Sequence, residues 1–407
     1  MGDISKKEGA LYFDHEYVVN KMREGYPYFR IEDCRTDIIR QGAEYTHPDV
    51  AVQASSEQIE MLKPSCDLLS TPEERQQLRD DDHAFFEGFV DKQFRDHPEW
   101  KEFCYLEEYD APGCPEEPDQ SVHIVVLRQK APGPHPTIFY IPVRALVYNT
   151  PYIAVCPPMA KFLGVNIVIP VPRTDADGEY PATVNDCHAG YQWMVDHAKE
   201  IEVDLDRVAI AGGSSGGQIC SAFPFRLKRY HWCRAPMPRG VLVDDGFFDD
   251  KEKWASQRMI NEQWCGITNR AANMLYFGKN FASGFIGPEG CANHATVEEC
   301  RGLPPYLIYI GQDNCGSSSA LEFTMKLTEA GVYCNLLFLG GATHARPADE
   351  NGVWNAVFTC LDSCPVYEPR ADISASNVNE VFLVGGMRDL LTHDFRRLPL
   401  TEYDVKQ

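Results

Sequence analysis

The stretch AGGSSGG (211–217) places Ser214 in a G-x-S-x-G pattern directly after the apolar run RVAIA (207–211). A nucleophilic serine at a sharp strand–turn–helix junction needs small neighbours, because the backbone there is strained and crowded. Such a turn lifts the hydroxyl clear of the sheet and directs helix N-terminal amides toward a developing negative charge. A glycine-rich turn without chemistry is the alternative. The strand-like run before Ser214 and the helical pattern after it favour the nucleophile.

A serine nucleophile needs a general base, and the base needs an acid that orients it. At nucleophile elbows of this type the chain order is Ser, acidic residue, His. Asp313 follows the apolar run YLIYIG (306–311), and His344 follows NLLFLG (335–340). Both should lie at carboxyl ends of strands, where open α/β sheets build their sites. Ser214, Asp313 and His344 are therefore a candidate triad for acyl transfer. A surface aspartate and a loop histidine are the alternative interpretation.

The elements that must position these residues are short apolar runs separated by helical patterns. Several runs are β-branched and apolar on both faces, which is typical of central parallel strands. Helical patterns cover 181–201 and 318–331. The alternation predicts an α/β fold with a mostly parallel sheet and helices on both faces. The expected strands are 122–128, 137–141, 165–170, 207–211, 240–243, 306–311 and 335–340.

The rest of the chain frames this core. A helix is expected from Pro72 to about Pro98, because Thr71 can cap it and Glu74 completes a capping box. The predicted organisation is an N-terminal helical lid region (1–120), an α/β core (121–245 and 301–365), an inserted lid segment (246–300) and a C-terminal extension (366–407).

Composition restricts the function further. A net charge of −22 argues against nucleic acid and anionic membrane surfaces as partners. The sequence contains no run of 18 apolar residues, so no membrane span is expected. Its first residues do not form the apolar region of a secretory signal. We expect a cytoplasmic protein whose 15 cysteines are reduced and mostly buried. The expected partner is a small-molecule substrate. The sequence also leaves open assembly into a homodimer. No metal or organic cofactor is expected; the acidic stretch DDGFFDD (244–250) is interpreted as a solvated lid edge, with a metal site as the alternative.

Several motifs resemble the α/β-hydrolase fold-3 carboxylesterases, also called the hormone-sensitive lipase family. DLDRVAIAGGSSGG resembles that family's elbow, and RTDADGEYPATVNDC resembles a second motif through Arg173, Pro181, Ala182 and Asp186. GLPPYLIYIGQDNC and LTEAGVYCNLLFLGGATH resemble the strands leading to the family's triad acid and histidine. The resemblance covers roughly residues 120 to 365. It implies a helical lid over a hydrolase core and the same three triad residues.

The chain departs from the family at its oxyanion loop. PVRALV (142–147) stands where the family has H-G-G-G. Backbone amides of Arg144, Ala145 and Ser215 could still form the oxyanion hole. Arg144 and Arg346 replace family glycine and phenylalanine, which suggests that they bind a polar or anionic substrate. Salt bridging to the chain's acids, such as Asp175, Asp244 or Asp349, is the alternative role for these arginines.

The sequence thus predicts a serine hydrolase that cleaves an ester, lactone or related acyl bond of a small organic molecule. Two alternatives stay open. The altered oxyanion loop also fits a hydrolase fold recruited for cyclisation, elimination or isomerisation in specialised metabolism. A ligand-binding protein with an inactive pocket is the second, and an intact Ser-Asp-His set argues against it.

Overall fold

The computed structural model describes residues 72–144, 146, 148–149, 151, 163–230, 236–251, 273, 276–281, 286–343 and 391. Within them, eight strands form one sheet in the order β1-β2-β6-β3-β7-β8-β9-β10. From β6 to β10 neighbouring strands are parallel, whereas β2 runs antiparallel to both β1 and β6. The strands are β1 (Cys104–Pro112), β2 (Ser121–Gln129), β3 (His135–Ile141), β6 (Asn166–Val171), β7 (Val203–Gly213), β8 (Gly240–Asp244), β9 (Tyr306–Asp313) and β10 (Cys334–Thr343).

All seven strands expected from the sequence are present, and the mostly parallel sheet is confirmed. The reason is visible in β6, where Ile167 and Ile169 pack into one apolar cluster and Val168 packs into the other. Alternate side chains of a strand point to opposite faces. A strand that is apolar at every position is therefore stable only between two covering layers.

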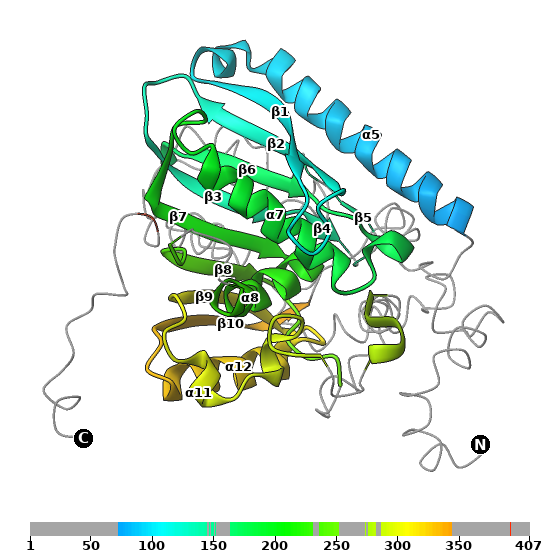
Figure 1. The fold of residues 1–407 in the computed structure, drawn as a ribbon, viewed down its shortest axis with the longest axis vertical. Helices are drawn as coiled ribbons and strands as arrows, with labels where there is room; N and C mark the ends of the chain where they lie inside the picture. The colour runs from blue at the N-terminus through cyan, green and yellow to red at the C-terminus, as the bar shows by residue number, and fades with distance from the viewer. Residues whose placement is uncertain are drawn as a thin grey trace, which may run out of the picture.

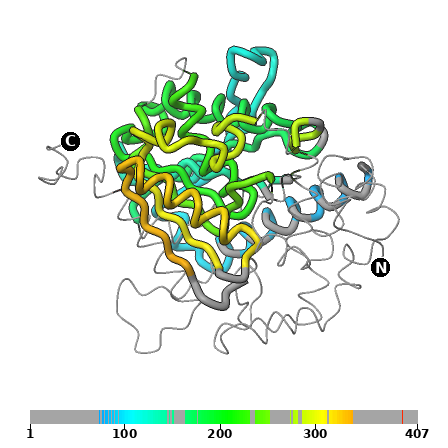
Figure 2. Tube along the Cα trace, turned by 90° about the horizontal axis from the view of Figure 1, so that it is seen from below, coloured from blue at the N-terminus to red at the C-terminus, as the bar shows by residue number. Residues whose placement is uncertain are grey.

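The two covering layers are unequal. Helices α7 (Ala182–Asp196), α8 (Ser214–Arg229) and α12 (Ser317–Glu329) contribute to the larger apolar cluster, on one face of the sheet. On the opposite face lies α5 (Pro72–Asp96), whose Val90 belongs to the smaller cluster. Figure 1 shows α7 and α8 in front of the sheet and α5 along its β1 edge. Figure 2, turned by 90°, separates the blue α5 from the green helices.

Short elements complete the described chain. A two-stranded ladder of β4 (Val143–Arg144) and β5 (Tyr148–Asn149) follows β3. The remaining elements are η2 (Pro98–Glu102), η4 (Asp175–Gly178), η5 (Gly278–Asn280), η6 (Ala292–His294) and α11 (Val297–Cys300). None of the helices in these described stretches has the length and apolar composition needed to cross a bilayer.

The sheet begins earlier than the boundary at residue 120 expected from the sequence. Cys104–Pro112 forms the edge strand β1, which pairs with β2 from Cys104↔Gln129 to Pro112↔Ser121. Its sequence, CYLEEYDAP, carries acidic residues in the middle because much of it is only partly buried. An edge strand with so few apolar residues gives a weak strand signal. At the other end of the chain, Leu391 of the C-terminal extension is 2% exposed and belongs to the smaller apolar cluster.

The acidic stretch after β8 is not a solvated edge. Phe248 is fully buried, and Asp249 and Asp250 are only 3% and 1% exposed. Phe248 stacks on Phe323 of α12 with ring centroids 5.4 Å apart. The interpretation from the sequence gave too much weight to the acidic residues. The two phenylalanines between them carry the segment into the interior, because burying an aromatic side chain is strongly favourable.

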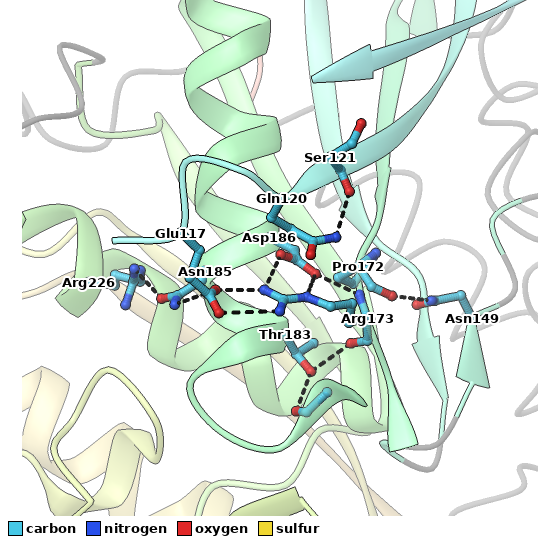
Figure 3. A network of polar contacts seen from close by, with 11 residues as sticks. Glu117, Gln120, Ser121, Asn149, Pro172, Arg173, Thr183, Asn185, Asp186 and Arg226 are labelled. Carbon is cyan, nitrogen blue, oxygen red and sulfur yellow. Dashed lines mark hydrogen bonds and ion pairs between the residues drawn. The ribbon is translucent and has the colours of Figure 1, made fainter. Parts of the chain in front are cut away.

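A network of charged side chains holds the loop after β6 against α7 (Figure 3). The Arg173 guanidinium donates to both carboxylate oxygens of Asp186, at 2.8 and 2.7 Å, and to Glu117 at 2.6 Å. Asn185 donates to the same Glu117 carboxylate and accepts from Arg226 of α8 at 2.6 Å. These hydrogen bonds, first of all that from Arg173, lower the pKa of Glu117.

The network ends inside the protein on His188. The buried Arg226 donates from Nε to His188 Nδ1 at 3.0 Å, and His188 has no exposed surface. Burial, and then the positive charge of Arg226, lower the pKa of His188 to about 3. His188 is therefore a neutral histidine of the core.

This histidine should make the protein sensitive to acid. An unfolded histidine takes up a proton near pH 6.5, whereas folded His188 stays neutral down to about pH 3. Because the unfolded state then binds more protons, stability falls as pH drops below 6.5. Between pH 6.5 and 4.5 this amounts to on the order of 2–3 kcal/mol at 1.36 kcal/mol per pKa unit. In urea titrations, His188→Gln, which keeps an acceptor for Arg226, should show a shallower loss than the wild type. If the free energy of unfolding fell equally with pH in both proteins between pH 6.5 and 4.5, a neutral folded His188 would be contradicted. Above pH 7 the free energy of unfolding should change with pH to the same extent in both proteins.

Candidate active site

Ser214 stands at a sharp junction between a strand and a helix. The strand β7 ends at Gly213, and Ser214 is the first residue of α8. Its φ angle is +53°, a left-handed conformation that is uncommon for any residue other than glycine. Residues held in such conformations cluster at functional sites, where the surrounding structure enforces them. The strand–turn–helix context expected for the G-x-S-x-G pattern is therefore present.

The glycines around Ser214 are required by close backbone contacts. A Cβ on Gly216 would overlap the carbonyl oxygen of Ile141, at the end of β3, and lie 3.2 Å from that of Val143. A Cβ on Gly212 would lie 2.6 Å from the carbonyl oxygen of Gly216. Backbone packed this tightly leaves no room for a side chain. The first turn of α8 is thereby seated directly against the segment after β3.

The same helix also packs against the loop after β8, which in turn packs against the loop after β9. A Cβ on Gly217 would lie 2.9 Å from the Cα of Gly246, just after β8. A Cβ on Gly316, after β9, would lie 2.8 Å from the carbonyl oxygen of Gly246. Three glycines thus bring the loops at the carboxyl ends of β7, β8 and β9 into contact. This edge is where an open α/β sheet builds its sites.

Gly213 differs from these glycines because it has room. A Cβ there would lie 3.5 Å from the Asp244 carbonyl oxygen and 3.6 Å from its carboxylate, which are ordinary contacts. Gly213 is the residue that pairs with Asp244 across β7 and β8. An aspartate at 213 would place a second carboxylate beside that of Asp244. Like charges at such a distance repel, which disfavours an aspartate at this position.

The proposed acid, Asp313, lies where the ends of β9 and β10 pair. Asp313 is the last residue of β9, and its backbone pairs with Thr343, the last residue of β10. His344 comes directly after Thr343 and, like Ala145 and Arg346, lies outside the described residues. The structure describes the backbone of Asp313 and of Arg144, so their side-chain roles stay predictions.

Asp245 is a positioning residue that the sequence analysis missed. Its Oδ1 accepts hydrogen bonds from the Gly311 amide and from Asn314 Nδ2, both at 3.0 Å. These bonds fix the backbone on both sides of Asp313. Asp245 is 4% exposed and has a φ angle of +50°. The available signal was the Asp-Gly pair 245–246 directly after a strand, a pattern typical of tight turns.

The loop after β3, expected from the sequence to be the oxyanion loop, is described at Pro142, Val143 and Arg144. Pro142 and Val143 are buried, and Arg144 pairs with Tyr148 in the β4–β5 ladder. Pro142 has no N–H to donate. The Ser215 amide lies in the first turn of α8, where N–H groups have no partner within the helix. Of the three amides proposed for the oxyanion hole, the Ser215 amide lies at a helix N-terminus, a position that suits this role.

Two further expectations concern cysteines and metals. The eight cysteines among the described residues are free thiols, and seven of them are buried, including Cys315 two residues after Asp313. The expected packed, reduced thiols are confirmed for this part of the chain. A separate cluster, Asp249, Asp250, Cys291 and His294, holds donor types that could bind a metal ion. It belongs to the loop after β8 and the segment around η6.

This sheet and this elbow define an α/β-hydrolase-fold protein. Residues 148–347 match the family model described as alpha/beta hydrolase fold, which confirms the resemblance to the fold-3 family. A bacterial heroin esterase superposes with a TM-score of 0.62 at 19% identity, over 76% of this chain and 90% of that chain. Esterase LipW from Mycobacterium marinum gives a TM-score of 0.62 at 17% identity, over 79% and 91%. At such identities, these two structures establish the fold.

A curated relative is similar over a shorter stretch. Esterase LipI from Mycobacterium tuberculosis is 35% identical over 56 residues, which are 14% of this chain and 18% of LipI. The match therefore spans less than a fifth of that relative.

The contact at Gly216 leads to a paired test. Gly216→Ala should destabilise the protein by about 1–3 kcal/mol, the usual cost of overpacking, because its Cβ meets backbone of β3. Gly213→Ala is the matched control, since its Cβ meets only ordinary contacts and its φ of −115° suits alanine. Free energies of unfolding from urea titration would separate the two. Equal values for both variants would show that the elbow does not depend on this contact.

Proposed function

We propose that the protein is a serine hydrolase that cleaves an ester, lactone or related acyl bond of a small organic molecule. The observation that carries the proposal is the left-handed backbone of Ser214 at the junction of β7 and α8. A strained serine at this point exposes its hydroxyl beside the N-terminus of a helix. The esterases among the similar proteins support the same class of reaction.

The proposed mechanism is acyl transfer in two halves. Ser214 Oγ attacks the acyl carbon while His344 takes its proton, and Asp313 holds the imidazolium that forms. Collapse of the tetrahedral intermediate returns the proton to the leaving alcohol. Water then attacks the acyl-enzyme, with His344 again as base, and releases the acid. The contact between Asp313 and Thr343 supports this assignment, because it brings the positions of acid and base to adjacent strand ends.

The oxyanion would be stabilised by backbone amides of Ser215, Arg144 and Ala145. Each well-placed donor is worth about 10²–10³ in rate. The close packing of Gly216 on Ile141 supports this arrangement, because it sets the loop after β3 beside the first turn of α8. Asp313 and His344 would then complete the site from the other side of Ser214.

Non-hydrolytic chemistry is the second candidate, and one observation favours it. The loop after β3 begins with Pro142, which has no amide proton, and continues into the β4–β5 ladder at Arg144. A loop shaped in this way offers fewer free amides than a glycine-rich one. An enzyme with a weak oxyanion hole would use His344 as a general acid and base for cyclisation, elimination or isomerisation. A simple p-nitrophenyl ester separates the two, because a serine hydrolase should turn it over.

Replacing the nucleophile should abolish turnover. Ser214→Ala should lower kcat by at least about 10³-fold, because the triad acts as a unit, and should remove labelling by a fluorophosphonate probe. The matched control is Ser221→Ala on the same helix, whose hydroxyl donates only to the Gln218 carbonyl; it should keep both properties. Turnover near the wild-type level in Ser214→Ala would exclude covalent catalysis by this serine. Labelling without turnover of any ester would favour the ligand-binding alternative.

The two unusual arginines give a test of substrate charge. We propose that Arg144 and Arg346 bind an anionic or strongly polar part of the substrate. One competing salt-bridge partner, Asp175, is already engaged by Arg79 at 2.6 Å. Arg144→Gln and Arg346→Gln should lower kcat/KM for a carboxylate-bearing ester by roughly 10- to 150-fold, the equivalent of about 1.5–3 kcal/mol. A neutral ester of the same shape should be affected little. Equal losses on both esters would show that the arginines only hold their loops.

A further inference from the structure

Four side chains of metal-binding types meet in the interior behind the elbow. Asp249 and Asp250 follow β8, and Cys291 and His294 flank and end η6. One carboxylate oxygen from each aspartate, the cysteine sulfur and an imidazole nitrogen all lie within 4.8 Å of one another. The His294 side chain is 8% exposed, and the other three are more deeply buried. The four donors come from segments more than 40 residues apart, so tertiary folding brings them together.

The backbone around the cluster is firmly held. The Phe248 carbonyl accepts from the Asn293 amide at 2.9 Å and from the Cys291 thiol at 3.1 Å. The Asn293 side chain donates to the Ser319 carbonyl of α12 at 2.8 Å. The two segments that supply the donors are therefore joined to each other and to a neighbouring helix. Because the backbone is held in this way, the four donors need only small side-chain movements to contact an ion.

The imidazole is oriented as a ligand would be. His294 Nδ1 lies 2.6 Å from the Ile286 carbonyl oxygen, outside the cluster. A carbonyl can only accept, so Nδ1 donates to it, and Nε2 faces the cluster, where it pairs with Asp250 Oδ1 at 2.6 Å. A backbone carbonyl that holds one ring nitrogen in this way is the usual partner of metal-binding histidines.

We propose that Asp249, Asp250, Cys291 and His294 bind a zinc ion. Thiolate, imidazole and carboxylate together are a donor set that suits Zn²⁺, and four protein ligands make a closed tetrahedral site. A divalent cation would add positive charge where the two buried carboxylates and the other two donors face one another. Zinc bonds of about 2.0–2.3 Å spread the donors around the ion, so the ion replaces the contact between His294 and Asp250.

Binding changes the protonation of the cluster in a defined way. Two protons leave to solvent: the proton of the hydrogen bond between His294 Nε2 and Asp250 Oδ1, and the thiol proton of Cys291, whose S–H bond breaks so that the sulfur electron pair binds zinc. With all four positions filled by protein, no site stays open for a substrate or a reactive water. The ion would therefore stabilise the fold. It would clamp the loop after β8, whose Gly246 packs on Gly217 of the elbow helix, to the segment around η6. From the sequence, a solvated lid edge was preferred to a metal site for the stretch 244–250.

The test measures metal content of the full chain, purified without a histidine tag. Zinc is added to the protein, and the unbound excess is removed by desalting. Inductively coupled plasma mass spectrometry should then find about one zinc ion per chain. Cys291→Ser and His294→Gln should each bind zinc at least about tenfold more weakly. Cys187→Ser is the matched control, because Cys187 is equally buried but stands outside the cluster; it should keep its zinc.

A spectroscopic measurement on the wild-type protein covers the case in which the variants fail to fold. Cobalt substituted for zinc should give tetrahedral d–d bands and a thiolate-to-cobalt charge-transfer band. A wild-type protein that binds neither ion, a cobalt spectrum without thiolate, or a Cys291→Ser variant that keeps its zinc would overturn the proposal. Ester hydrolysis does not enter these readouts, so the outcome is independent of the proposed activity.

Discussion

The tight seat of α8 on the carboxyl edge of the sheet is the constraint on which the rest of the structure depends. Gly216 and Gly217 let the first turn of the helix approach the backbone of Ile141 and Gly246 without intervening side chains. Because the first turn of α8 lies so close to the carboxyl edge of the sheet, the chain must turn from β7 into α8 within one residue. That residue is Ser214, whose positive φ is the local consequence. A bulkier turn would relieve the strain but would move the helix away from the segments after β3 and β8.

Charged groups organise the same edge of the sheet from within. In a chain of net charge −22, the interior contains cations as well as acids. Arg173 is held by Asp186 and Glu117, and the buried Arg226 ends on the neutral His188. Each of these contacts joins a loop or helix that is distant in sequence. Breaking one partner would leave a buried charge unpaired, which costs more than the pair contributes. The network therefore restricts how the loop after β6 can lie beside the elbow.

The loop after β8 serves both the proposed catalytic centre and the proposed metal site. Asp245 holds the backbone around Asp313, Gly246 contacts α8, and Asp249 and Asp250 reach the cluster with Cys291 and His294. Seven consecutive residues, 244–250, thus carry roles that differ in kind. Their acidic composition reflects these positions in the fold, since each carboxylate is placed against a particular donor, strand end or cluster.

The sequence by itself determined the strands, their order in the chain and the elbow. Runs such as VNIVIP (165–170) are apolar at every position, and only a strand covered on both faces buries both sets of side chains. Ser214 was identified because the residues on either side of it must be small, a requirement that is local. The edge strand β1 escaped prediction because its partly exposed face gives a weak apolar signal. Burial of Asp249 and Asp250, the role of Asp245 and the meeting of Cys291 with His294 were decided only by tertiary structure. The identity of a polar residue does not indicate which segment its side chain will face. The distances between segments are set only when the layers pack together.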